Sequence, residues 1–345
     1  MNDPLTLEPP PRPLHQLLEE HFSGATLSEL LGPEPGALGR HLWSVALEAP
    51  ISGFLARPGK AFRADLVSRS FELAGGEGPC PPLLSVIVEL LHAGSLIIDD
   101  IEDGSSSRRG GPALHHSHGL PLALNAGNWM YFWALGLIEQ AGASPELELT
   151  LHRWAHRTML RCHHGQALDL TVDVYQLRPS EVPGVVQAAA ELKTGALMEL
   201  AAVLGAVAAG AAPALVNELA GFGRALGVTL QMLDDVGGLV SERLCHKGHE
   251  DLCLGRPTWP WAWLSAELPA SRFEELRQQG REIRRSQLHP EVVARQIRAE
   301  LRGSGRVRVR RQIRQAFGRL EAAVGPGAAL QDLRAQLQRM EKSYG

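Results

Sequence analysis

Long stretches with helical spacing of apolar residues dominate the chain, and strand signals are nearly absent. The stretch 83–98 is rich in apolar residues, and further long helical segments are predicted at 147–174, 179–209 and 213–239, with Gly and Pro between them. No sustained alternation of apolar and polar residues occurs, and no repeated strand–helix–strand order. We therefore expect an all-α fold in a single domain, with about ten or more helices around a central cavity.

The ends of the chain and its apolar stretches predict one domain after a short tail, without a membrane-spanning segment. We expect residues 1–11, which are rich in proline, to be a mobile tail, and residues 12–345 to form one all-helical domain. The start has no basic segment followed by an apolar core, which argues against a signal peptide. The apolar stretch 200–216 is mostly Ala and Gly and contains Pro213. It predicts a core helix rather than an integral membrane segment.

Charge and cysteine content indicate which partners and which cellular compartment to expect. The net charge of −4 gives no general signal for nucleic acid. The four cysteines in 345 residues are typical of a reducing compartment, so we expect a cytoplasmic protein. The segment 303–318 is rich in arginine, and six further arginines lie between 281 and 302. This pattern favours a solvated, arginine-rich helix face, with weak attraction to an anionic membrane surface as the alternative.

The run Asp99-Asp100-Ile101-Glu102-Asp103, followed by Arg108-Arg109, is the strongest chemical signal. Asp99 and Asp103 are four residues apart, so on a helix they share one face at about 6 Å. Mg²⁺ in proteins is commonly held by one or two carboxylates together with substrate phosphates. A purely structural acidic helix end is unattractive, because negative charge at a helix C-terminus opposes the helix dipole. Asp100 and Glu102 point elsewhere and are candidates for supporting contacts.

A second acidic site follows another apolar stretch. It comprises Asp234 and Asp235, with Gln231 one helical turn earlier. Two aspartate clusters on separate helices are more specific than either cluster alone. Together with the two arginines, they predict a diphosphate chelated by Mg²⁺.

The chain resembles the trans-isoprenyl diphosphate synthases of the polyprenyl synthetase family, including farnesyl and geranylgeranyl diphosphate synthases. The resemblance extends over residues 59–260. The matching segments, in chain order, are Gly59-Lys60-Ala61-Phe62-Arg63, Glu89-Leu90-Leu91-His92, Asp99 to Asp103, Arg108-Arg109-Gly110-Gly111-Pro112, Asn125-Ala126-Gly127-Asn128, Gly165-Gln166 with Asp169-Leu170, Lys193-Thr194-Gly195, Gln231 with Asp234-Asp235, and Gly255-Arg256-Pro257-Thr258-Trp259-Pro260.

The resemblance implies an isoprenoid synthase type I helical bundle and a Mg²⁺-dependent prenyltransferase, commonly a homodimer. It condenses isopentenyl diphosphate with an allylic diphosphate to give a longer trans-prenyl diphosphate. The implied metal ligands, for three Mg²⁺, are Asp99, Asp103 and Asp234, and with Lys193 these are the implied catalytic residues. The allylic diphosphate would be held by Arg108, Lys193, Gln231 and Lys247. The diphosphate of isopentenyl diphosphate would be bound by Lys60, Arg63, His92 and Arg109. Thr194 and Arg256, in matching segments, are further substrate-binding candidates.

Two alternatives stay open at this point. Gly238 stands where the family usually has a third aspartate, and Asp234 with Glu242 also resembles the second metal motif of class I terpene cyclases. A non-catalytic regulatory subunit is the other alternative. A cyclase has no use for a second diphosphate pocket, and the first acidic motif is complete, so chain elongation is favoured.

Product length is expected to depend on the helix before the first acidic motif. Gly94 and Ser95, about one turn before Asp99, are small and would leave the cavity open, whereas Leu91 and Val88 lie deeper on the same face. A geranylgeranyl or longer product is therefore expected. The apolar segment 122–137 is a candidate for the dimer interface.

Overall fold

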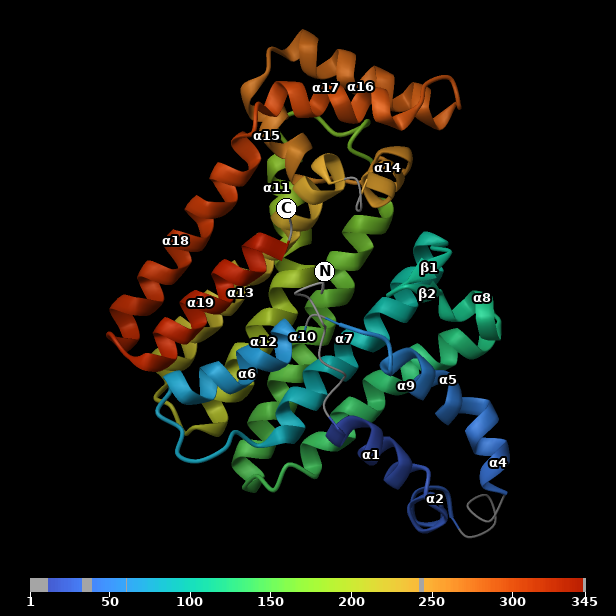
Figure 1. Cartoon of the computed structure of the whole chain (residues 1–345), viewed down its shortest axis with the longest axis vertical. Helices are drawn as coiled ribbons and strands as arrows, with labels where there is room; N and C mark the ends of the chain where they lie inside the picture. Colours follow the sequence, from blue (N-terminus) through green and yellow to red (C-terminus); the bar gives the residue numbers. More distant parts are fainter. Residues whose placement is uncertain (1–11, 33–38, 60, 242–244, 344–345) are drawn as a thin grey trace, which may run out of the picture. The chain divides into compact units, whose positions relative to one another are not determined.

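The computed structural model describes residues 12–32, 39–59, 61–241 and 245–343. The predicted mobile tail 1–11, Lys60 and Glu242 lie outside these residues. The prediction of an all-α fold is confirmed, since helices make up nearly all of the regular structure (Figure 1). The chain divides into two compact units, Met1–Ser68 with Cys80–His152 and Arg69–Pro79 with Arg153–Gly345. The prediction that residues 12–345 form one functional domain stays a prediction.

Unit 1 is a set of helices with one small hairpin. Two helices, α6 (Phe62–Leu73) and α10 (Pro145–Thr171), contribute residues to both units. The other elements of unit 1 are α1 (Arg12–His21), α2 (Gly24–Leu31), α4 (Arg40–Trp43), the π-helical turn η1 (Ser44–Glu48), α5 (Ala49–Leu55), α7 (Pro82–Asp103), β1 (Ser107–Arg108), β2 (Gly111–Pro112), α8 (Leu114–His118) and α9 (Leu120–Glu139).

Helix α7 packs against α9 in the middle of unit 1 (Figure 1). Its apolar side chains, among them Ile87, Leu90 and Ile97, are buried, which explains the long apolar stretch in the sequence. Gly104 ends α7 in the left-handed conformation, at φ +65°, so the acidic run occupies the last turn. Among the described residues α7 alone has the length and apolar character of a membrane span. It is half buried in the fold, as a core helix would be.

The predicted helices of unit 2 are also present. Inside the predicted helix 179–209 the structure has a π-helical turn at Glu191–Gly195 that the sequence did not indicate. The elements are α11 (Val182–Ala190), the π-helical turn η2 (Glu191–Gly195), α12 (Ala196–Ala208), α13 (Pro213–Val240), α14 (Cys245–Leu254), α15 (Trp259–Glu267), α16 (Ala270–Arg284), α17 (Pro290–Leu301), α18 (Ser304–Val324) and α19 (Ala328–Ser343).

The core of unit 2 is the pair α12 and α13, and α18 also packs against α13. Nearly every residue of α12 is buried, so the expectation of a core helix at 200–216 holds as far as Ala208, where a turn leads to Pro213. Glycines allow close approach: a Cβ on Gly227 would lie 2.6 Å from Cα of Gly195. This contact fixes α13 against the turn η2.

Candidate active site

In unit 1, a two-residue hairpin presents the two arginines of the first motif. Ser107 pairs with Pro112 and Arg108 with Gly111. The connecting residues Arg109 and Gly110 both have positive φ, +50° and +76°, as a tight hairpin turn of this length requires. Arg57, in the loop after α5, holds the hairpin, because its Nη1 donates to the carbonyls of Arg108 (3.0 Å) and Pro112 (2.8 Å).

Arg108 folds back onto the end of α7. Its Nε donates to Oδ1 of Asp100 at 2.7 Å, and its Nη2 also contacts that oxygen. The same Nη2 lies 3.7 Å from Oδ2 of Asp99. Asp100 is completely buried, and this burial raises its pKa, against the lowering effect of Arg108. Asp100 therefore supports Arg108 and is not itself available to a substrate.

Asp99 and Asp103 are half-buried on one face of α7, as their spacing predicts. Among the described residues, no group of three or more His, Cys, Asp or Glu side chains is placed to hold a metal ion. A pair of carboxylates suits Mg²⁺ that also binds phosphate oxygens and water, since Mg²⁺ usually takes only one or two carboxylates from the protein. The donor set thus fits a metal that arrives with a diphosphate.

A second cationic cluster in unit 1 surrounds His92. The pKa of His92 is well below its ordinary value, because of burial first and then because of the positive charges of Arg63, Arg109 and Arg108. Burial also lowers the pKa of Arg109; the charge of Glu89 acts to raise it, and Arg63 and Arg108 act to lower it. Gly59 belongs to this cluster, since a Cβ there would lie 3.3 Å from Cζ of Arg109. Several guanidiniums near a neutral imidazole are suited to binding a multiply charged anion.

In unit 2, the π-helical turn η2 carries Lys193 and Thr194. π-helical turns are rare and often mark functional sites. Nζ of Lys193 donates to Oδ2 of Asp169 on α10 at 2.8 Å. Gly165 lets α10 approach this turn, because a Cβ there would lie 2.5 Å from the backbone nitrogen of Lys193. Arg256 also reaches α10, where its Nη1 donates to the carbonyl of Asp169.

A chain of hydrogen bonds links Thr194 to the second aspartate site. Oγ1 of Thr194 donates to Oε1 of Gln231 at 2.9 Å, and Nε2 of Gln231 donates to Oδ1 of Asp235 at 2.8 Å. The other oxygen of Asp235 accepts the backbone N–H of Trp259 at 2.8 Å. Burial raises the pKa of Asp235 to about 7 in spite of these donors. Asp235 is thus occupied inside the fold, whereas Asp234 is half-buried on another side of α13.

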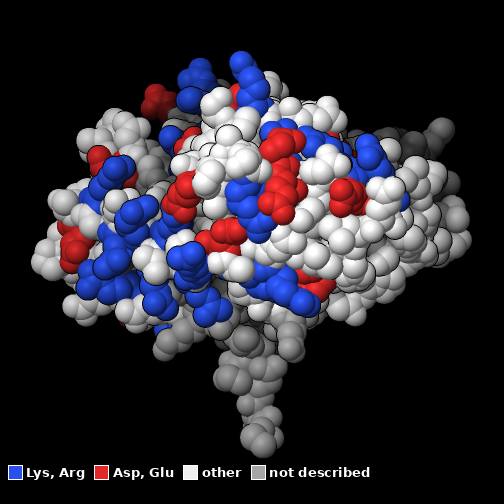
Figure 2. All heavy atoms as spheres, turned by 90° about the horizontal axis from the view of Figure 1, so that it is seen from above, with Lys and Arg blue, Asp and Glu red and all other residues white. Residues whose placement is uncertain are grey.

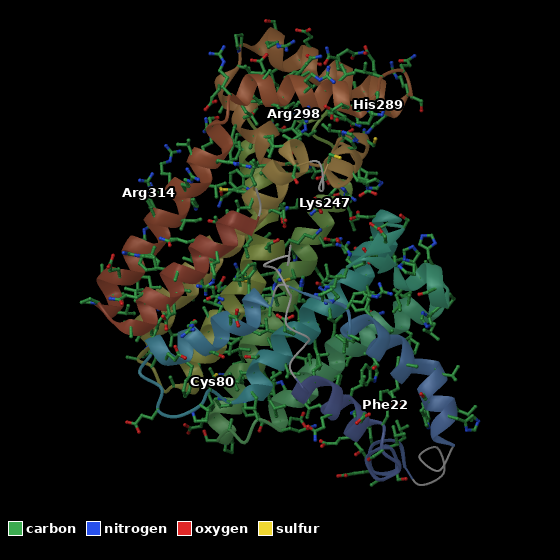
Figure 3. The ribbon with its side chains drawn as sticks, viewed as in Figure 1. Phe22, Cys80, Lys247, His289, Arg298 and Arg314 are labelled. Atoms are coloured by element: carbon green, nitrogen blue, oxygen red, sulfur yellow. The ribbon has the colours of Figure 1, made fainter. Side chains whose placement is uncertain are left out.

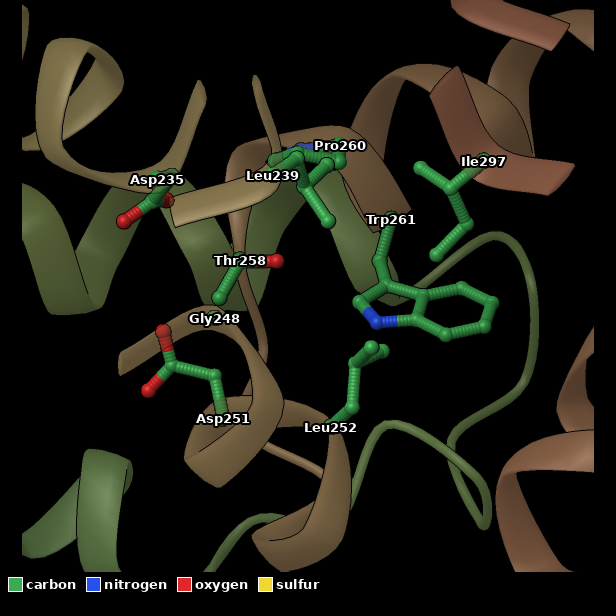
Figure 4. A pocket seen from close by; sticks show the side chains of 9 residues that line it. All are labelled: Asp235, Leu239, Gly248, Asp251, Leu252, Thr258, Pro260, Trp261 and Ile297. Atoms are coloured by element: carbon green, nitrogen blue, oxygen red, sulfur yellow. The ribbon is translucent and has the colours of Figure 1, made fainter. Parts of the chain in front are cut away.

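Helix α14 packs closely against α13 beyond these aspartates. A Cβ on Gly248 would lie 2.1 Å from the carbonyl oxygen of Gly238, so the position without its expected aspartate lies against the backbone of α14. Lys247 lies on the same helix (Figure 3) and its charge acts to lower the pKa of Asp235. Between Asp235, Asp251 and Thr258 is a cavity of about 10 Å³ (Figure 4), which matches a single water and not a substrate.

The matching segments of the sequence therefore form two polar sites, one in each unit. The family model described as Polyprenyl synthetase matches residues 44–288, which include every segment of both sites. The chain belongs to the polyprenyl synthetase family.

Known members of the polyprenyl synthetase family agree with this assignment. The geranylgeranyl diphosphate synthase of Sulfolobus acidocaldarius is 32% identical over 187 residues, which are 53% of this chain. The chain spans little more than half of that relative, 56% of its length. A heptaprenyl diphosphate synthase from Staphylococcus aureus shares the fold, with a TM-score of 0.77 at 18% identity and 96% of each chain covered.

A third similar protein of the family was solved with ligands. It is the polyprenyl synthase of Caulobacter crescentus, complexed with calcium and isoprenyl diphosphate. Its TM-score is 0.66 at 24% identity, with 92% of each chain covered. At this identity the likeness supports the fold alone.

The residues predicted to determine chain length divide between two faces of α7. Gly94 faces α9, since a Cβ there would lie 2.8 Å from the carbonyl oxygen of Gly127 and 3.1 Å from the ring of Tyr131. Ser95 lies four residues before Asp99, so the two share a face, and its Oγ donates to the carbonyl of His92 at 2.8 Å. Leu91 is buried, four residues before Ser95. Gly94 thus has a packing role that the sequence did not indicate, and its influence on product length stays a prediction.

Three supporting roles were not assigned from the sequence. Asp169 holds Lys193, Arg57 holds the hairpin, and Asp235 orients Gln231. Asp169 and Asp235 were visible in the matching segments. The partner of Asp169 lies 24 positions away, too far to be inferred from spacing, whereas Gln231 lies only four residues before Asp235 on α13, an interval at which helical side chains meet. Arg57 lies outside every matching segment, so no signal in the sequence pointed to it.

Proposed function

We propose that this protein condenses isopentenyl diphosphate with an allylic diphosphate and releases a longer trans-prenyl diphosphate, geranylgeranyl or longer, and pyrophosphate. The single observation that carries the proposal is the cationic cluster of Arg63, His92 and Arg109 in unit 1. This cluster is additional to the carboxylate pair of α7. An elongating enzyme needs a second diphosphate site, whereas a cyclase with one diphosphate substrate does not.

In this proposal Asp99, Asp103 and Asp234 would hold three Mg²⁺ ions, which would in turn bind the allylic diphosphate. The metal supplies charge that stabilises the departing pyrophosphate. Arg108, Lys193, Gln231 and Lys247 bind that same diphosphate, so that positive charge already stands where negative charge develops. The contacts of Asp100 with Arg108 and of Asp169 with Lys193 keep both side chains in place.

The second substrate is assigned to the cluster around His92. Arg63 and Arg109 bind the diphosphate of isopentenyl diphosphate, and neutral His92 donates a hydrogen bond to it; Lys60, outside the described residues, completes the set. The double bond of isopentenyl diphosphate attacks the allylic carbon as its bond to oxygen breaks. A proton then leaves the new chain, with the released pyrophosphate as its acceptor. Thr194, which donates to Gln231, and Arg256, which donates to the carbonyl of Asp169, are further substrate-binding residues in this proposal.

The test is an incubation of purified protein with Mg²⁺, labelled isopentenyl diphosphate and one allylic primer of five, ten or fifteen carbons, with products separated by length. We expect label in a prenyl diphosphate of about twenty carbons or more.

Two controls test the proposed metal site. A chelator should abolish the reaction and added Mg²⁺ should restore it. Asp99→Asn should be nearly inactive, whereas Glu102→Gln, an exposed carboxylate on the same turn, should retain activity. Release of a hydrocarbon without use of isopentenyl diphosphate would instead favour the cyclase.

We also propose a homodimer in the cytoplasm. Helix α9 exposes Leu120, Leu124 and Phe132, and Phe132 is 72% exposed. Such a run of apolar side chains on one helix is typical of an interface. All four cysteines are free thiols, in line with a reducing compartment. In sedimentation analysis the wild type should be dimeric and Phe132→Glu should shift towards monomer.

A further inference from the structure

Helix α18 carries a concentration of arginines that neither polar site uses. Between Leu301 and Leu320 the chain has seven arginines and no acidic residue. Six of them are exposed, namely Arg302, Arg306, Arg310, Arg311, Arg314 and Arg319. Arg306, Arg310 and Arg314 follow one another at intervals of four, so they form a row along one face of the helix. Arg314 projects from α18 in Figure 3.

The opposite face of α18 holds the helix in unit 2. Val309, Phe317 and Leu320 are buried, and the contact with α13 is extensive. A Cβ on Gly305 would lie 3.0 Å from Val236 of α13. The seventh arginine, Arg308, belongs to this packing, because it pairs with Glu267 and lies over the ring of Trp263 at 5.3 Å. The exposed arginines are therefore fixed on a rigid support.

The exposed face contains one apolar side chain among the arginines. Val307 is 61% exposed and lies three and four residues before Arg310 and Arg311. Figure 2 shows Lys and Arg side chains gathered at the left of that view, where α18 runs. The chain as a whole has a net charge of −4, so this face departs from the average charge of the protein. We name it the basic face of α18, made of Arg306, Val307, Arg310, Arg311 and Arg314.

We propose that the basic face of α18 binds the surface of an anionic lipid bilayer. Arginines near such a surface are attracted by its negative potential, and the attraction weakens as salt rises. Val307 can enter the boundary between headgroups and acyl chains, which an amphipathic surface helix uses for binding. Single-stranded nucleic acid is a poorer fit, since it needs exposed aromatic rings for stacking. The aromatic residue in 302–319 is Phe317, and it is buried.

The experiment is co-sedimentation of the full chain, without substrate, with vesicles of phosphatidylcholine alone or with about a third of phosphatidylglycerol. We expect binding to the anionic vesicles at ~50 mM salt and its loss at ~500 mM salt. The affinity of the variant R306Q/R310Q/R314Q for these vesicles should be lower than that of the wild type by at least about tenfold. Val307→Glu, at an exposed position that leaves the arginines in place, should also bind more weakly.

The matched control is R153Q/R178Q/R295Q, which removes the same charge from exposed positions on α10, the loop before α11, and α17. It should bind like the wild type, and thermal unfolding should show that both triple variants remain folded. Equal loss in the control would mean that overall charge, not the basic face, is responsible, and would overturn the proposal. Absence of wild-type binding, or tighter binding to polyuridylate through the same three arginines, would overturn it as well. Because no substrate is used, failure here leaves the proposed reaction untouched.

Discussion

Asp100, fully buried at the end of α7, accepts a hydrogen bond of 2.7 Å from Nε of Arg108 on β1. The guanidinium also lies 3.7 Å from Asp99, so the pair sets the position of a cation beside a proposed metal ligand. A buried carboxylate costs free energy unless it is paired. The pairing with Arg108 therefore offsets the cost of burying Asp100, and Asp100 in turn holds the guanidinium of Arg108 in place.

Asp100→Asn should separate this supporting role from metal binding. The amide keeps the size of the side chain but loses its charge, and charge-assisted hydrogen bonds contribute about 1.5–3 kcal/mol. If that contribution is expressed in the transition state, kcat/KM for the allylic diphosphate falls by roughly ten- to hundredfold. Steady-state kinetics with each substrate varied in turn measure this effect. Unchanged kinetics in a folded variant would show that Arg108 does not depend on Asp100.

His92 should give the protein a specific pH dependence of stability. Burial and the neighbouring arginines hold its pKa well below the ordinary value of 6.5, so the folded state keeps the ring neutral where the unfolded state binds a proton. The stability is therefore fully present above pH 6.5 and is lost as the pH falls below it. The loss amounts to at most about 1.4 kcal/mol per pH unit.

Denaturant unfolding at pH 7.5 and pH 5.5 should detect the effect of His92. The free energy of unfolding of the wild type should fall between these values, and His92→Gln should fall less. His116→Gln, which removes an exposed histidine of α8, is the control and should follow the wild type. Parallel pH profiles for the wild type and His92→Gln would contradict the assignment.

Gly94 and Ser95 should respond differently to substitution, although they are neighbours. Gly94→Ala places a Cβ 2.8 Å from the carbonyl oxygen of Gly127, so α7 and α9 must move apart at a cost of about 1–3 kcal/mol. Ser95→Phe adds bulk on the face of Asp99, and it should shorten the product. Thermal unfolding and product analysis of both variants test this. A product of unchanged length with Ser95→Phe would reject the placement of the cavity below Asp99.

The helices and the acidic faces were predictable because their signal is local. Apolar spacing predicted α7 and α13 within a few residues, and the four-residue interval placed Asp99 and Asp103 together and Asp100 apart. The hairpin at 107–112 was not predicted, because strands of two residues show no alternation. The turn η2 inserts its extra residue without changing the apolar pattern around it. Both elements were marked only by the family segments.

Most of the supporting contacts could not be predicted, since they join residues far apart in the sequence; Gln231 and Asp235, four residues apart on α13, are the exception. Lys193 and Asp169 are 24 positions apart and belong to different helices. The packing role of Gly94 depends on where α9 lies, which its own helix does not reveal. Short-range patterns therefore predict which side chains carry the chemistry. The side chains that hold them in place follow only from the packing of the helices.

Arg284 is a further supporting residue, and its contact with Asp173 joins positions 111 residues apart in the sequence. It holds the C-terminal end of α14. Its Nε donates to the carbonyl of Cys253 at 3.0 Å, and its Nη1 donates to Oδ2 of Asp173 at 2.6 Å. Its Nη2 reaches the carbonyl of Leu254. These contacts surround Gly255, whose φ of +65° precedes the proposed substrate-binding residue Arg256.

Arg284→Gln should therefore disturb the loop that carries Arg256. Loss of charge-assisted bonds to two carbonyls and a carboxylate should lower the free energy of unfolding by about 1–3 kcal/mol. If the loop is displaced, KM for the allylic diphosphate should rise more than KM for isopentenyl diphosphate, because Arg256 contacts the turn of α10 that holds Lys193. Arg285→Gln, at the exposed neighbouring position, is the control. Equal changes in both KM values would show a general loss of structure, and Arg284 would then have no positioning role.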